Sequence, residues 1–314
     1  MPEWTKSSAP RTRIGFLLFD RFSNLCLANC IEPLRAANSL GASTVFEWTV
    51  LSLDGAPTRS SSDIEMIAKS AVSQMAKVDY LFVLASYGHE AHDTPRTRRQ
   101  LRDAVRHTNR VVGLDTGPWL LASAGLLDGK RATVHWDVLD AFTERFLAVE
   151  AERAHVLTDG NVITCAGAMS ALGLTLDLIA QHLGMSARLD VEALFLQGDP
   201  PVGGGRATQV TDPLVRKGLQ LMRDTIENPI SVQQLAQRLS CQPRTLDRRF
   251  RARLGAPPGK VYRHLRLAAA RKFIEDSTLG VAEIAVRCGY DSPAAMTRAI
   301  RRQYGTTPRE LRRH

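Results

Sequence analysis

The residue with the most chemical promise is an aspartate at the end of a short apolar run. Asp115 follows residues 110–114, which are expected to form a buried strand, and a helix is expected to begin at Gly117. The helix N-terminus at such a strand-to-helix turn stabilises negative charge. A carboxylate there could attack a carbonyl group or face a cation. His135 is the one suggestive catalytic partner, although a histidine satisfied by its neighbours explains it equally well.

Tryptophans and a second acid lie in the segments expected around Asp115. An aromatic face attracts a quaternary ammonium or guanidinium group by roughly 0.5–2 kcal/mol, so acids beside tryptophans suit a cationic ligand. The alternative is that both tryptophans are ordinary core residues. The candidate ligand-binding residues are Glu32, Asp115, Thr116, Trp119, His135 and Trp136.

The cysteines and histidines do not form a pattern typical of a metal site. Five cysteines are scattered without a CxxC pair, which argues against a disulfide framework and against structural zinc. Cys165 could replace a nucleophile, but a buried, inert thiol is the better interpretation. His89 and His92 have HxxH spacing in a polar loop without an evident third ligand. We therefore predict no metal and no cofactor.

Strands and helices are expected to alternate over residues 14–196. Short continuous apolar runs predict strands buried on both faces, and this alternation indicates an α/β fold with a parallel sheet covered by helices on both faces. Ligands bind such sheets at the carboxyl ends of the strands, the edge at which Asp115 is expected. The expected strands are 14–19, 48–53, 80–85, 110–114 and 161–164.

The net positive charge is confined to the C-terminal third. Residues 207–314 contain 21 Lys and Arg against 9 Asp and Glu, a net charge of +12, whereas the whole chain carries +9. Only the C-terminal part is therefore expected to meet phosphates. The glycines and prolines from Gly198 to Gly205 predict a linker. We expect an N-terminal domain over 12–197, a linker over 198–211 and a C-terminal domain over 212–314.

Two helix-turn-helix patterns lie in tandem in that C-terminal part. The first covers residues 231–250 and opens with Ser231, which with Gln234 three residues on can form a capping box. The second covers residues 280–300 and turns at Gly289. One match could be chance, but two joined by a basic amphipathic stretch predict binding to double-stranded DNA.

Residues 212–314 resemble the AraC/XylS family of transcription regulators. The resemblance implies an all-α domain that places two recognition helices in the major groove, roughly 34 Å apart. It departs at Ala295-Met296, where many members carry an aromatic residue. The motifs that carry it are Leu235-Ala236, Pro243 to Phe250, Arg266 to Arg271, Ile284-Ala285, Cys288 to Tyr290 and Tyr304 to Arg312.

The recognition helices supply the candidate DNA contacts. An arginine can hold guanine through two hydrogen bonds, which discriminates against other bases by roughly 1–3 kcal/mol. RNA polymerase is the protein partner that the resemblance implies. The candidate DNA-binding residues are Arg244, Thr245, Arg248, Arg249, Ala294, Thr297, Arg298 and Arg301.

Residues 12–196 resemble the PfpI-like, class I glutamine-amidotransferase-like superfamily, in the form fused to AraC domains in GlxA-like regulators. The segments Gly113 to Trp136, Glu32 to Asn38 and Thr164 to Gly167 carry this resemblance. It implies a flavodoxin-like sheet and a homodimer. In the enzymes of the superfamily a cysteine stands at the elbow position that Asp115 occupies here. We therefore predict that catalysis is lost and the cleft is kept.

Together these features predict a cytoplasmic transcription regulator, an activator, that responds to a ligand. GlxA-like relatives include regulators of arginine, carnitine and glycine betaine use, so the resemblance implies a small amine-bearing effector. One alternative is an active PfpI-like hydrolase or amidase fused to a DNA-binding domain, which Asp115 disfavours. Another is a constitutive repressor whose N-terminal domain only dimerises. The polar N-terminus and the lack of a long apolar run argue against secretion and a membrane.

Overall fold

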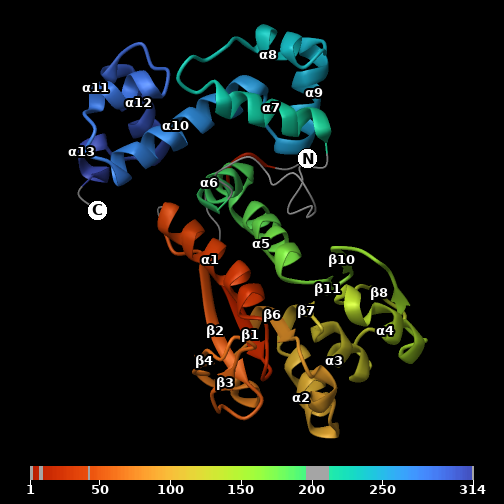
Figure 1. Ribbon diagram of the computed structural model, residues 1–314. Coiled ribbons are helices and arrows are strands. Elements are labelled where there is room, and N and C mark those ends of the chain that lie inside the picture. Colours follow the sequence, from red (N-terminus) through yellow and green to blue (C-terminus); the bar gives the residue numbers. More distant parts are fainter. Residues whose placement is uncertain (1–2, 7–9, 42, 196–211, 313–314) are drawn as a thin grey trace. The chain divides into compact units, whose positions relative to one another are not determined.

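The computed structural model describes residues 3–6, 10–41, 43–195 and 212–312, which pack into two compact units (Figure 1). The first unit contains residues 10–41 and 43–178. The second contains residues 3–6, 179–195 and 212–312. The predicted linker, 198–211, lies outside the described residues. Within the described ranges, none of the helices has the length and apolar character needed to cross a bilayer.

A seven-stranded sheet forms the centre of the first unit. Its order is β10 (Val156–Asp159), β11 (Val162–Cys165), β7 (Thr108–Asp115), β6 (Val78–Ala85), β1 (Thr12–Leu18), β2 (Phe46–Ser52) and β5 (Ser70–Ala71). Neighbouring strands are parallel except β10 and β11. The apolar runs form the central strands because both faces are covered, and Phe16, Phe82 and Leu84 are fully buried. This is the predicted α/β fold.

Helices cover both faces of this sheet (Figure 1). One face carries α1 (Asn24–Leu40) and α5 (Ala168–Leu183), and the other carries α2 (Pro95–Val105), α3 (Gly117–Ser123) and α4 (Leu139–Arg145). On the second face, Leu81 and Val83 of the sheet share a core with Leu101 of α2 and Leu120 of α3. The short elements are β3 (Thr58–Arg59), β4 (Glu65–Met66), β8 (Arg131–Ala132), β9 (Glu150–Ala151), η1 (Val72–Gln74), η2 (His89–His92) and η3 (Trp136–Val138).

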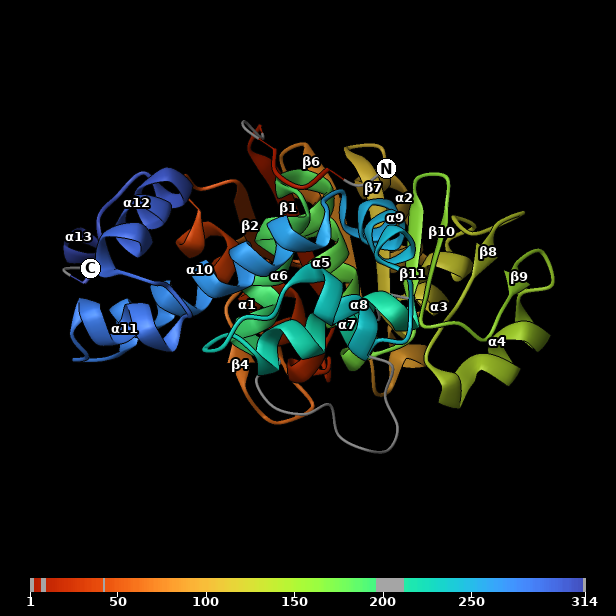
Figure 2. The ribbon, with the colours of Figure 1, turned by 90° about the horizontal axis from the view of Figure 1, so that it is seen from above.

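The second unit is built around one long helix, α10 (Pro258–Asp276). Val261 and Leu265 of α10 join the core of one helix group, and Leu267 and Ile274 join the core of the other. Figure 2 shows α10 running between the two groups. The first group is α7 (Pro213–Asp224), α8 (Val232–Arg238) and α9 (Pro243–Leu254), and the second is α11 (Val281–Arg287), α12 (Pro293–Tyr304) and α13 (Pro308–Leu311).

Both predicted helix-turn-helix motifs are present, as α8–α9 and α11–α12. The Oγ of Ser231 accepts from the N–H of Gln234, whose side chain accepts from the N–H of Ser231, so the predicted capping box forms. The recognition helices α9 and α12 each begin with a proline and end at a glycine of positive φ, Gly255 (68°) and Gly305 (73°). Local sequence thus sets the length of both recognition helices.

One helix, α6 (Met185–Phe195), lies outside the elements predicted from sequence. It follows α5 after the single residue Gly184, which adopts a φ of 90°. The last turn of α5 and α6 pack with the C-terminal helices, although the sequence assigns residues up to 197 to the N-terminal domain. The second unit therefore contains a segment, the end of α5 and all of α6, that lies outside the helix-turn-helix motifs.

Candidate ligand site and nucleic-acid interface

Asp115 ends β7 in an unusual backbone conformation. Its φ is 59°, in the left-handed region that aspartate adopts more readily than most residues. The N–H of Thr116 donates to the carbonyl of Ala85, and a Cβ on Gly117 would lie 2.1 Å from the carbonyl oxygen of Val83. The turn therefore packs directly on β6, and only glycine fits at position 117.

The carboxylate of Asp115 is bound by a serine from the end of β6. The Oγ of Ser86 donates to Asp115 Oδ2 at 2.8 Å and accepts from the N–H of Ser23 at 2.9 Å. Asp115 is only 8% exposed. Burial is the largest influence on its pKa and raises it, while the Ser86 hydrogen bond and the charge of His135 lower it without cancelling that effect. A bound positive charge would therefore favour the ionised carboxylate.

His135 and Trp136 border the same turn. The N–H of His135 donates to the carbonyl of Asp115 at 2.9 Å, and its Nδ1 accepts from the N–H of Asp137 at 3.3 Å. Its ring centroid lies 5.2 Å from that of Trp136. A Cβ on Gly167 would lie 3.4 Å from His135 Cδ2, so the residue before α5 lies close to the His135 ring.

Four large exposed apolar side chains lie one or two positions along the chain from the contact residues Ser23, Ser86, His135 and Gly167, and we name them the apolar rim. Tyr87 is 61% exposed and Trp136 63% exposed, while Leu25 and Met169 lie in the first turns of α1 and α5. Each lies within two residues of a residue that contacts the turn or its neighbours. Leu25 and Met169 are missing from the sequence prediction because an apolar residue at a helix start is usually part of the core. Apolar and aromatic side chains together with a buried acid are what a site for an organic cation requires.

Two of the predicted ligand-binding residues have other partners. Thr116 is buried, and its hydroxyl donates to the carbonyl of Ser86 at 2.9 Å. The carboxylate of Glu32 accepts from Arg35 at 2.7 Å within α1. Contacts of either residue with a ligand stay predictions, and the geometry instead brings Asp115, His135 and Trp136 together.

Trp119 lies in a buried cluster and not on the apolar rim. It is 3% exposed, and its ring lies 4.8 Å from that of His89 and 5.2 Å from that of Phe146. The guanidinium of Arg145 lies over it at 5.7 Å. These neighbours favour the interpretation of Trp119 as a core residue. Its predicted contact with a ligand is untested.

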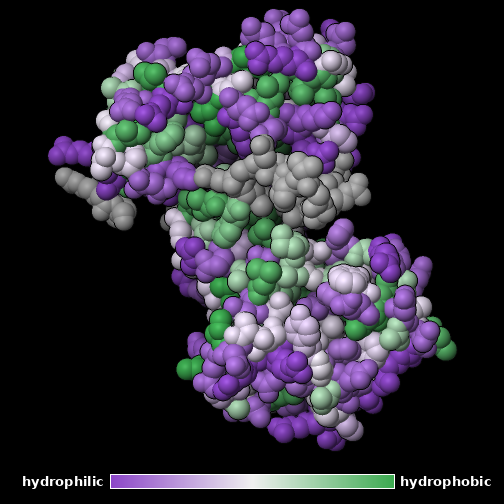
Figure 3. All heavy atoms as spheres, viewed as in Figure 1, coloured by the Kyte–Doolittle hydropathy of each residue, from purple (hydrophilic) through white to green (hydrophobic). Residues whose placement is uncertain are grey.

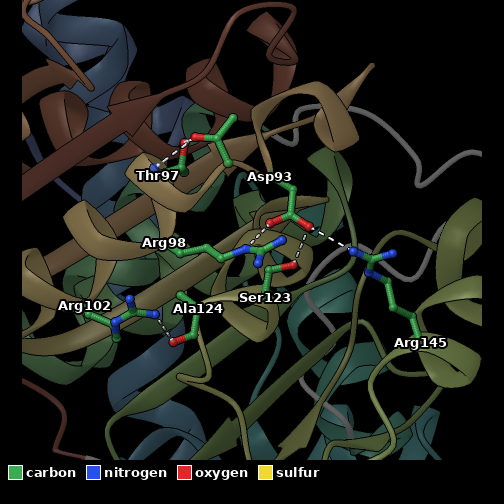
Figure 4. Close-up of polar contacts among 8 residues, drawn as sticks. Asp93, Thr97, Arg98, Arg102, Ser123, Ala124 and Arg145 are labelled. Atoms are coloured by element: carbon green, nitrogen blue, oxygen red, sulfur yellow. Dashed lines mark hydrogen bonds and ion pairs between the residues drawn. The ribbon is translucent and has the colours of Figure 1, made fainter.

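Asp93 forms hydrogen bonds with three side chains, one of them from Arg145, which also contacts Trp119 (Figure 4). It accepts from Arg98 at 2.7 Å, from Ser123 at 2.9 Å and from Arg145 at 3.2 Å. Burial tends to raise the pKa of Asp93, but the bonds and charges of these partners outweigh it and lower the pKa. The network links α2, α3 and α4, so it helps to hold α3, the helix that follows Asp115, in place.

The cysteines of this unit are buried thiols. Cys26, Cys30 and Cys165 are all 0% exposed, and burial raises the pKa of Cys165 to about 12. A thiol that stays protonated is a poor nucleophile.

His92, one of the two histidines with HxxH spacing, contacts the carbonyl of Asp20 at 3.0 Å. Among the described residues, no three or more His, Cys, Asp or Glu side chains are arranged to hold a metal ion.

The recognition helices present the predicted DNA contacts on their outer faces. Arg244 and Arg248 are one helical turn apart on α9, as Ala294 and Arg298 are on α12. Figure 3 shows hydrophilic side chains over much of the visible surface of the C-terminal helices. The exposed members are Arg244, Arg248, Arg249, Ala294, Arg298 and Arg301, and the half-buried ones are Thr245 and Thr297.

Arg249 differs from its neighbour Arg248. Its Nη1 donates at 3.0 Å to the carboxylate of Asp212, whose side chain is 2% exposed. The same carboxylate accepts from the N–H of Leu214 and so caps α7. Arg249 therefore neutralises a buried acid of its own domain. Its contact with DNA stays a prediction.

Comparison with known proteins covers both units. The helix-turn-helix domain family model matches residues 235–314, and the DJ-1/PfpI family model matches residues 12–181. The chain is 35% identical over 304 residues to the HTH-type transcriptional regulator CdhR of Pseudomonas aeruginosa, covering 95% of this chain and 90% of that protein. It is 33% identical over 311 residues to the HTH-type transcriptional regulator GlxA of Rhizobium meliloti, covering 96% and 95%.

Similarity to solved structures and to an enzyme is more limited. The crystal structure of an AraC family transcriptional regulator from Pseudomonas putida matches with a TM-score of 0.52 and 27% identity, covering 59% of this chain and all of that one. The isonitrile hydratase of Pseudomonas putida is 26% identical over 195 residues, covering 62% of this chain and 82% of the enzyme. The relatives that match nearly the whole chain are regulators. The chain belongs to the AraC family of DNA-binding transcription regulators, in the group that carries a DJ-1/PfpI domain at the N-terminus.

Proposed function

We propose that the Asp115 site binds a small metabolite with a cationic amine group and that its occupancy controls transcription, as an activator. The observation that supports this most directly is a buried carboxyl group whose contact residues, Ser86 and His135, are each followed in the chain by an exposed aromatic residue. A betaine, carnitine or arginine has the required charge. In this proposal the carboxylate of Asp115 faces the cation, and Tyr87 and Trp136 contact its apolar surface.

The pKa of Asp115 explains why a cation is preferred over a neutral ligand. An ionised carboxylate in a buried place is disfavoured unless an opposite charge lies near it. The hydrogen bond from Ser86 compensates for this only in part, because the pKa remains raised. A quaternary ammonium group supplies the missing charge and needs no hydrogen-bond acceptor of its own. Aromatic faces add roughly 0.5–2 kcal/mol to such a contact.

Control of transcription requires that the ligand prefer one state of the protein. A ligand shifts an equilibrium only by its difference in affinity for the two states. We propose that binding changes either a homodimer or the relation of the two units, and thereby the fit of α9 and α12 to DNA. Loss of catalysis accompanies this role, since the nucleophilic position holds Asp115 and the nearby thiols are buried.

Isothermal titration of the full chain with glycine betaine, carnitine, choline and arginine tests the proposal. One of these should release or absorb heat with wild type, and Asp115→Asn should weaken that binding strongly. Asn keeps the size of the side chain and tolerates the left-handed backbone. The matched control is Asp103→Asn, since Asp103 on α2 is 71% exposed and forms an ion pair with Arg106 of the next turn. No heat with any of the four compounds would refute the assignment of the ligand class.

An enzymatic function is the second candidate, because the elbow geometry and the resemblance to isonitrile hydratase both belong to an enzyme fold. A carboxylate nucleophile that attacks an amide or ester would displace the amine or alcohol and leave a mixed acyl anhydride on Asp115, which water would hydrolyse to the acid and the free carboxylate. Mass spectrometry of the intact chain after incubation with amides, esters and isonitriles detects such an adduct or its products. Turnover that Asp115→Asn abolishes would favour the enzyme over the sensor.

A further inference from the structure

The middle of α10 carries a buried contact that the DNA-binding motifs do not explain. His264 is 3% exposed, and its Nε2 lies 2.9 Å from Asp190 Oδ1 and 3.3 Å from the carbonyl of Ser186, both on α6. Burial by itself lowers the pKa of His264, but the charge and hydrogen bond of Asp190 raise it further than burial lowers it. The pair therefore favours a charged imidazolium held by α6.

The N-terminal residues complete this contact. Trp4 is 6% exposed and meets the ring of His264 edge-on at 5.2 Å. Its carbonyl accepts from the N–H of Ser186, and the carbonyl of Glu3 accepts from the N–H of Met185. Trp4, Met185 and Leu189 share one core with α7, α8 and α9. Residues 3–6 and α6 together form one bracing element on α10, and we name it the brace.

The brace contacts α10 at the boundary between the two helix groups. Leu265, next to His264, belongs to the core of the first group, and Leu267 belongs to the core of the second. Asp190 also lies near enough to Tyr304, the last residue of α12, to help raise the pKa of that tyrosine, although burial is the larger cause. A movement of α6 would therefore shift the contacts of both helix-turn-helix motifs.

We propose that the brace fixes the spacing of the two recognition helices through the His264–Asp190 contact, and that it transmits the state of the ligand site. The second part rests on the proposed function. The path is continuous in the chain: α5 begins directly after Gly167, where an added Cβ would lie 3.4 Å from His135, and it ends one residue before α6. Displacing α6 would loosen α10 and lower the affinity for DNA that needs both helices at once.

Binding to two DNA duplexes distinguishes a change in the spacing of the recognition helices from a loss of folding. The first is a duplex selected from random-sequence DNA by the full wild-type chain, and the second is the same duplex with one half-site scrambled. Joint binding of two sites gains from the effective concentration that their connection provides, and a loose connection reduces that gain. Asp190→Asn and His264→Gln should each weaken binding to the first duplex roughly tenfold and change binding to the second less than about twofold. The double variant should equal the single ones, since both remove the same contact.

Matched controls keep the test specific. Asp224→Asn removes an exposed acid of α7 and should leave both affinities unchanged. Lys6→Ala is a milder second variant, because Lys6 is exposed and its Nζ donates to the carbonyl of Gln181 in the last turn of α5. It should lower affinity for the first duplex in the same direction but by less. Equal losses on both duplexes, or no loss on the first, would overturn the proposal.

The ligand-dependent part is tested separately. With a compound that binds wild type in the titration above, the affinity for the first duplex should change in wild type. Asp190→Asn should bind the compound equally well but show no such change. A compound-dependent change that survives in Asp190→Asn would overturn transmission through the brace. If no compound binds wild type, the proposed function fails while the two-duplex result stands.

Discussion

The candidate ligand site and the recognition helices of this chain are built in opposite ways. At the elbow, the turn from Asp115 to Gly117, one acid is buried, and the backbone two residues later has room only for glycine. On α9 and α12 several exposed side chains extend from helices whose cores do not include them. Folding and chemistry are therefore joined at the elbow and separable on the recognition helices. Substitutions in the two regions should differ in kind as well as in size.

The largest expected effect is at Gly117. Gly117→Ala should destabilise the N-terminal unit by roughly 3 kcal/mol or more, because the new Cβ would lie 2.1 Å from a backbone carbonyl of β6. Gly129→Ala is the control: it has a φ of 69° but nothing within 4 Å of its Cβ, so it should cost only about 1 kcal/mol. Thermal unfolding followed by circular dichroism measures both. Equal effects would show that the elbow is less constrained than its geometry indicates.

Two adjacent arginines give the next contrast. Arg248→Ala should weaken binding to selected DNA by roughly 1–3 kcal/mol and leave the melting temperature unchanged. Arg249→Ala should instead lower stability by roughly 1–3 kcal/mol, because it leaves the buried carboxylate of Asp212 without its ion pair. DNA titration and thermal unfolding of both variants separate the roles. Similar DNA losses without destabilisation would place Arg249 on the DNA surface beside Arg248.

The same contrast explains what sequence can predict. The apolar runs of β1, β6 and β7 and the cap at Ser231 are local patterns, and the structure has them where they are expected. The place of Asp115 between a strand and a helix is also local, whereas the positive φ of Asp115 and the packing of Gly117 on β6 are seen only in the structure. These features follow from period, propensity and neighbouring residues, without knowledge of distant contacts.

The features that sequence does not predict depend on distant partners. Trp119 and Trp136 look alike in the sequence, yet Trp119 is enclosed by Arg145 and its neighbours while Trp136 is exposed. Arg249 differs from Arg248 because of Asp212, which is 37 positions away. Packing of α6 on α10 pairs Asp190 with His264 across an even longer separation. Such pairings require the tertiary structure.

Trp136 belongs to the candidate ligand site but is exposed, so its substitution should affect binding and leave stability almost unchanged. It is 63% exposed, so Trp136→Ala should change the free energy of unfolding by less than about 0.5 kcal/mol. Under the proposed function it should weaken cation binding by roughly 0.5–2 kcal/mol, and Trp136→Phe should retain part of that affinity. Leu147→Ala, at 88% exposure and away from the apolar rim, is the control. Titration that finds no loss in Trp136→Ala would remove the tryptophan from the site.

The smallest expected effect is a gain in stability from Asp115, the residue that the proposed function places opposite the cation. Burial raises the pKa of Asp115 in the folded chain, so the folded state binds the proton more tightly than the unfolded state does. The ionised carboxylate therefore destabilises the ligand-free fold at neutral pH, and this penalty disappears as the pH falls below the unfolded pKa. Asp115→Asn should raise stability by roughly 1 kcal/mol near pH 7 and by progressively less in acid, as measured by urea unfolding. If Asn lowers stability at pH 7 instead, the carboxylate supports the empty fold, and the elbow is no longer a place where stability is given up for ligand binding.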